Sequence, residues 1–100
     1  MKLKKGVTLT GIRPELLIAI MVANDVYSYH GYEFVITSVT DGKHSKTSLH
    51  YPGFAFDSRI RNIDDDTISV IVEDLRNSLT DEFDVVLEGN HIHIEYQPKR

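Results

Sequence analysis

Cysteine is absent from this 100-residue chain, and basic residues, proline and glycine are few. Without cysteine the chain can form neither a disulfide framework nor a thiolate metal site, so any bound metal must be held by His, Asp or Glu. Lysine and arginine number 11 against 15 acidic residues, which gives a net charge of −4. The basic residues do not gather along one face of any segment, and this argues against nucleic-acid binding.

Long apolar runs are also missing. No run approaches the ~18 residues of a membrane-spanning helix, so we expect no membrane partner. The first six residues include three lysines, but residues 7–13 are too polar for the apolar core of a secretory signal. We therefore expect synthesis in the cytoplasm without a signal peptide.

The length predicts a single domain over residues 1–100. Apolar residues make up 41% and charged residues 26% of the chain, as in ordinary globular proteins. We find no internal repeat, low-complexity segment or linker, so all chemistry must arise within one core and its surface.

A first helix is predicted to begin at Pro14, since proline suits the first turn, and to end before Gly31. We expect one face of this helix to be core. At helical spacing that face comprises Leu16, Leu17, Ile20, Met21 and Asn24, widened by Ile18 and Val22. The helix is apolar around most of its girth.

A second helix is predicted over residues 67–79, where apolar residues recur at helical spacing. The three carboxylates at residues 64–66 precede it. They are interpreted as a cap at the positive helix end rather than as a metal cluster.

Four strands are predicted, at residues 32–38, 54–60, 83–88 and 91–96, and residues 1–12 are interpreted as an arm or short strand. Gly89-Asn90 joins the last two as a tight hairpin, with Glu88 opposite His91 and Val86 opposite His93. One hairpin face then carries Glu88, His91 and His93, and the core face carries Val85, Leu87, Ile92 and Ile94. The pattern predicts an α+β fold in which a small antiparallel sheet packs against two helices.

The His91-x-His93 spacing sends both imidazoles to one face of a strand, where they can flank a metal ion. Alternating polar residues also occur on ordinary surface strands, so the pair has a second interpretation. Glu88 shares that face, opposite a core face, and a metal with a carboxylate near its water explains such a cluster. Two histidines and one aspartate with a fourth position open form a catalytic zinc site.

The stretch Ser48-x-His50-x-x-Gly53-x-Ala55-x-Asp57 resembles the signature of the zinc D-Ala-D-Ala carboxypeptidase superfamily. That superfamily is similar in fold to the Hedgehog signalling domain, and it includes phage endolysins and vancomycin-resistance dipeptidases. Its second motif resembles His91-x-His93. The order of elements also matches, so the resemblance spans about the whole chain, and it is greatest to compact phage-associated members.

The resemblance implies a zinc-dependent peptidase that hydrolyses D-amino-acid-containing peptide bonds of peptidoglycan stem peptides. It implies phage or prophage origin and delivery to the cell wall by another factor. Zinc would polarise the scissile carbonyl and activate water, and a carboxylate would carry the proton to the leaving amine. The implied roles are zinc ligation by His50, Asp57 and His93, oxyanion stabilisation by His91, and substrate binding by Lys43, His44 and Ser48.

Two departures from the family pattern bear on the site. Many members carry an acid three positions before the last zinc ligand, but here that position is Asn90, so Glu88 is assigned as the base. Many also carry an arginine soon after the Thr-Ser of the first strand, which holds the substrate or the oxyanion, and none follows here. The candidates for holding the substrate or the oxyanion in this chain are Lys43, His44 and Arg59.

Two other functions stay open. In one, the chain is a catalytically inactive zinc-bearing binding or structural module of phage origin, which Asn90 favours. In the other, the histidines are metal-free surface groups of a phage particle protein. The sequence does not separate carboxypeptidase, endopeptidase and dipeptidase activity. We expect a monomer with a peptidoglycan peptide as its substrate.

Overall fold

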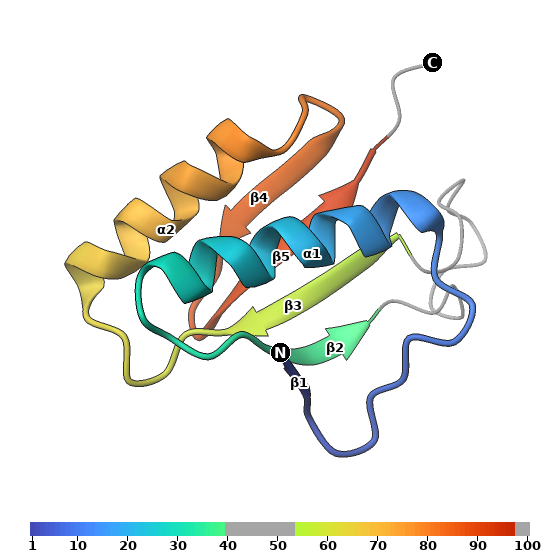
Figure 1. Cartoon of the computed structure of the whole chain (residues 1–100), viewed down its shortest axis with the longest axis horizontal. Helices are drawn as coiled ribbons and strands as arrows, with labels where there is room; N and C mark the ends of the chain where they lie inside the picture. Colours follow the sequence, from blue (N-terminus) through green and yellow to red (C-terminus); the bar gives the residue numbers. More distant parts are fainter. Residues whose placement is uncertain (40–53, 98–100) are drawn as a thin grey trace.

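A computed structural model describes residues 1–39 and 54–97 of the chain. Figure 1 shows the two helices lying on the same face of one sheet. The predicted α+β class with two helices is confirmed for this part of the chain. The elements are β1 (Lys2–Leu3), α1 (Pro14–Tyr29), β2 (Val35–Val39), β3 (Ala55–Arg59), α2 (Asp65–Ser78), β4 (Phe83–Leu87) and β5 (His91–Tyr96).

The sheet has the strand order β1-β2-β3-β5-β4. Its β1–β2 pair is parallel and its other pairs are antiparallel, so the prediction of a purely antiparallel sheet is wrong at this edge. The parallel pair joins Lys2 to Val35 and Leu3 to Ile36. Because α1 carries the chain back between β1 and β2, the two strands run in the same direction.

Helix α1 begins at Pro14, as predicted, and the chain turns at Gly31 with a φ of +85°. Of the predicted core face, Leu16 and Ile20 are buried, whereas Leu17 and Met21 are 44% and 62% exposed, so the rotation of the helix differs in part from the prediction. A helix that is apolar around its girth does not fix which side faces the sheet. The buried side is formed by Leu16, Ala19, Ile20, Ala23, Val26 and Tyr27.

Helix α2 begins after Asp64, whose side chain accepts a hydrogen bond from the Thr67 backbone N–H at 3.1 Å. Hydrogen bonds from Thr67 also lower the pKa of this carboxyl. The predicted capping role is therefore confirmed. Near the other end, Arg76 donates to the Val85 carbonyl through Nη2 at 2.7 Å and so ties α2 to β4. No helix in the described residues is long and apolar enough to span a membrane.

Alternate side chains of β3 point to opposite sides of the sheet, one toward the helices and the core and the other away from them. Phe56 and Ser58 are buried on the helix side, at 1% and 0% exposure. The Tyr27 hydroxyl lies 2.8 Å from Ser58 Oγ and donates to the Arg59 carbonyl at 3.0 Å. Burial raises the pKa of Tyr27 to about 12, so this hydroxyl stays protonated and holds the middle of β3 to α1. Asp57 and Arg59 consequently project from the other face.

Candidate functional site

The β4–β5 hairpin has the predicted register. Val86 pairs with His93, and the Glu88 backbone N–H donates to the His91 carbonyl at 2.9 Å. Of the predicted core positions, Val85, Ile92 and Ile94 are buried, whereas Leu87 at the strand end is 46% exposed. Glu88, His91 and His93 thus share the sheet face opposite the helices.

Strand β3 brings a carboxylate onto the same face. It pairs with β5 so that Asp57 is directly opposite His93 and Arg59 is opposite His91. Directly opposite residues have neighbouring side chains on one face. Thr37 of β2 lies beside them, with its hydroxyl 3.4 Å from the Asp57 carbonyl oxygen.

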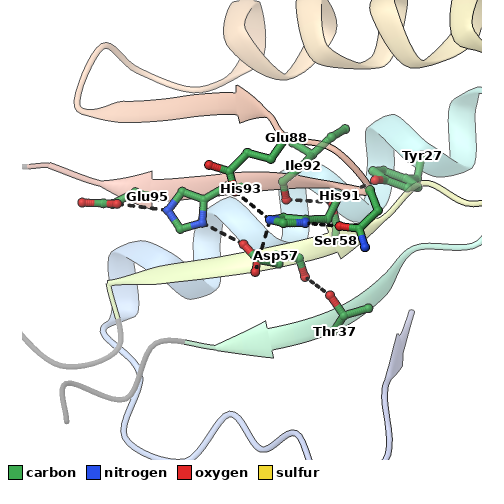
Figure 2. A network of polar contacts seen from close by, with 10 residues as sticks. Tyr27, Thr37, Asp57, Ser58, Glu88, His91, Ile92, His93 and Glu95 are labelled. Carbon is green, nitrogen blue, oxygen red and sulfur yellow. Dashed lines mark hydrogen bonds and ion pairs between the residues drawn. The ribbon is translucent and has the colours of Figure 1, made fainter. Parts of the chain in front are cut away.

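Five side chains form a row that alternates carboxylate and imidazole (Figure 2). His93 is in the middle, with Nδ1 2.7 Å from Asp57 Oδ1 and Nε2 3.0 Å from Glu95 Oε1. His91 Nε2 lies 3.6 Å from the other Asp57 oxygen and 2.8 Å from Glu88 Oε1. The order Glu88–His91–Asp57–His93–Glu95 therefore links three carboxylates through two rings.

The partners of His93 decide its protonation. Ionised carboxylates only accept hydrogen bonds, so a ring that lies between two of them donates from both nitrogens and is an imidazolium. The hydrogen bond to Asp57, opposed by partial burial and helped by Glu95, raises the pKa of His93 to about 9. Without a metal, His93 is charged at neutral pH.

His91 contacts different groups. Its Nδ1 lies 2.7 Å from Asn90 Oδ1, and its Nε2 lies between Glu88 and Asp57. Its side chain is 26% exposed and that of Glu88 is 48% exposed, so both can meet a ligand from solvent. Asn90, which stands where the family pattern has an acid, contacts the ring of His91.

The predicted zinc ligands fall into two groups. Asp57 and His93 are brought together from β3 and β5, whereas His50 lies outside the described residues. Within residues 1–39 and 54–97, no three His, Asp or Glu side chains are placed to hold a metal ion, so a zinc site needs a donor from elsewhere in the chain.

The donor chemistry of the pair fits zinc, which binds imidazole and carboxylate. Histidines that bind metals usually donate their other ring N–H to a carboxylate or carbonyl, which fixes the ring. Glu95 is placed to do this for His93 Nε2.

The remaining predicted site residues, Lys43, His44 and Ser48, also lie outside the described residues. Sequence reasoning missed two cations beside this face, Lys4 and Arg61, which line a pocket together with Arg59 and His91. The only sequence signal was the alternation in β3, which puts Arg59 on the face of Asp57.

No family model, curated protein or solved structure matches the chain.

Proposed function

We propose that the chain is a zinc-dependent peptidase that hydrolyses D-amino-acid-containing peptide bonds of peptidoglycan stem peptides. The observation that carries the proposal is the direct pairing of Asp57 with His93, 2.7 Å apart across β3 and β5. These are the two described residues at ligand positions of the motifs that resemble the D-Ala-D-Ala carboxypeptidase superfamily. His50 would complete the ligand set.

Bound zinc would supply Lewis-acid polarisation of the scissile carbonyl and a more acidic water. Asp57 and His93 would hold the metal, and Glu95 would keep His93 oriented through Nε2, at its distance of 3.0 Å.

Glu88 is the proposed proton carrier. Its carboxylate is half exposed and reaches the ring of His91 at 2.8 Å, on the face that carries Asp57. From there it accepts a proton from the attacking water and delivers it to the leaving amine. The N–H of His91 stabilises the charge that develops on the carbonyl oxygen.

The test is incubation of zinc-loaded protein with purified muropeptides and identification of the products by mass. We expect cleavage beside a D-amino acid, and a loss of about 100- to 10,000-fold in Glu88→Gln, which keeps the shape but accepts no proton. Glu73→Gln is the matched control, because Glu73 is exposed on α2, and α2 lies on the other side of the sheet from the site. A folded protein that takes up no zinc and cleaves nothing would refute the proposal.

A catalytically inactive zinc-bearing module is the second candidate. The observation that favours it is Asn90, an amide 2.7 Å from His91 where the family pattern has an acid. The same assay separates the two functions. One equivalent of zinc without hydrolysis, and a Glu88→Gln variant indistinguishable from the parent, would support the module.

A further inference from the structure

A pocket of about 350 Å³, lined in part by His91, lies on the sheet face opposite the helices. Its volume lies within the range of roughly 300–1,000 Å³ that is typical of small-molecule sites. Three of its six lining residues are cations. The lining comprises Lys4, Thr37, Arg59, Arg61, Asn90 and His91.

The cations come from three segments of the chain. The backbone N–H of Lys4 donates to the Ile36 carbonyl at 2.9 Å, which places it at the β1–β2 edge. Arg59 is on β3, two residues after Asp57 and directly opposite His91. Arg61 follows the end of β3 and is exposed. The pocket therefore continues the row of carboxylates and imidazoles with a region of opposite charge.

No ion pair among the described residues neutralises these three cations. Other cations do have partners, such as Lys2, 3.8 Å from Glu33, and Arg13, 3.7 Å from Glu15. Three like charges around one hollow repel each other. An anion in the pocket would remove that repulsion, and guanidinium groups match the geometry of a carboxylate.

We propose that Lys4, Arg59 and Arg61 bind a carboxylate of the peptide substrate, an inference that rests on the proposed function. The carboxylate is either the C-terminal group or an acidic side chain. Since one residue spans only ~3.5 Å of chain, a C-terminal carboxylate in the pocket leaves its own peptide bond beside His91 and Asp57. The pocket thus sets where along the peptide the reacting bond lies.

Binding to metal-free protein tests the pocket separately from hydrolysis. Zinc is removed with a chelator, and the chelator is dialysed away because it is itself a polycarboxylate. N-acetyl-D-glutamyl-D-alanine is then titrated at low ionic strength and followed by backbone-amide NMR. Its C-terminal amide and its D-glutaminyl analogue are titrated in parallel.

We expect one of the two blocked peptides to bind about tenfold more weakly than the free acid, and this identifies the carboxylate that is held. Lys4→Gln and Arg59→Gln should each weaken the free acid by a similar factor. Lys2→Gln, the same change two residues away, should leave it unchanged. Arg61→Gln, at an exposed position outside the strands, gives the same test if Arg59→Gln does not fold.

Equal binding of all three peptides, or equal weakening by Lys2→Gln and Lys4→Gln, would overturn the proposal. Carboxylate-dependent binding without any muropeptide cleavage would support the pocket and count against the proposed function. Cleavage without carboxylate-dependent binding would do the reverse.

Discussion

His93 makes the stability of the metal-free protein depend on pH. The pKa of His93 is raised from 6.5 to about 9 in the folded chain, chiefly by its hydrogen bond to Asp57. The folded state therefore holds a proton that the unfolded state releases between these two values. Stability is fully present below pH 6.5 and is lost as the pH rises through about 9.

The size of the loss follows from the shift. A difference of about 2.5 pKa units, at 1.36 kcal/mol each, gives about 3 kcal/mol as an upper limit for a side chain that is 25% exposed. Urea unfolding from pH 6 to pH 10, after removal of metal, measures it. His93→Gln supplies the non-titrating comparison, and Asp57→Asn should reduce the loss. Parallel pH profiles for wild type and His93→Gln would refute the reasoning.

Zinc should reverse this dependence. Zinc and a proton compete for Nδ1 of His93. Zinc binding therefore requires the ring to lose the proton that it donates to Asp57. The stabilisation that zinc adds should therefore grow as the pH rises from 6.5 toward 9, which urea midpoints with and without zinc would reveal. An increment that is the same at every pH would mean that His93 is not a ligand.

Three further outcomes are expected. His50→Ala and His93→Ala should lose zinc, whereas His91→Ala should keep about one equivalent of zinc and lose turnover. Metal analysis of the three variants measures this. Loss of zinc only in His91→Ala would mean that His91, and not His93, is the zinc ligand. Asn90→Asp should change peptide turnover by less than about threefold if another carboxylate is the base, and a large gain would identify position 90 as a lost base. Tyr27→Phe should lower the free energy of unfolding by about 1–2 kcal/mol, because it removes the hydroxyl that lies 2.8 Å from the buried Ser58 Oγ. An unchanged urea midpoint would contradict this prediction.

Local chemistry was sufficient to predict several elements. Gly89-Asn90 leaves only two residues between Glu88 and His91, so the turn fixes which residues face each other, and the register of Val86 with His93 followed. The carboxylates at residues 64–66 likewise indicated that a helix follows, since a carboxylate before a helix satisfies its free N–H groups, although α2 begins at Asp65 rather than at the predicted residue 67. These features depend on residues a few positions apart.

Features that depend on distant partners were not predictable. Residues 1–12 were predicted only as an arm or short strand, and the pairing of Lys2 and Leu3 with β2 depends on where α1 returns the chain. The side chain of His30, at the end of α1, is 16% exposed and lies 2.7 Å from Asp74 of α2, a partner 44 residues away. Such contacts require the order of the strands and the rotation of α1 to be known first.

The candidate site likewise has one part that the local sequence predicts and another part that depends on distant partners. The spacing of His91 and His93 put both rings on one face, because that follows from the geometry of a single strand. The contact of His93 with Asp57 needed β3 to be the neighbour of β5, which the sequence implied only through the resemblance to a known family. The cations of the pocket come from the residue after β1, from β3 and from the segment after β3, so no single stretch of sequence contained it.

The alternation in β3 also limits how the protein can change during evolution. Phe56 and Ser58 hold the strand in the core, while Asp57 and Arg59 face the site. Inserting or deleting one residue within the strand would exchange the two sets and bury both charges. Only mutations that preserve the alternation of buried and site-facing residues in β3 are compatible with the fold. New specificity at positions 57 and 59 can therefore arise by substitution, with the packing residues between them unchanged.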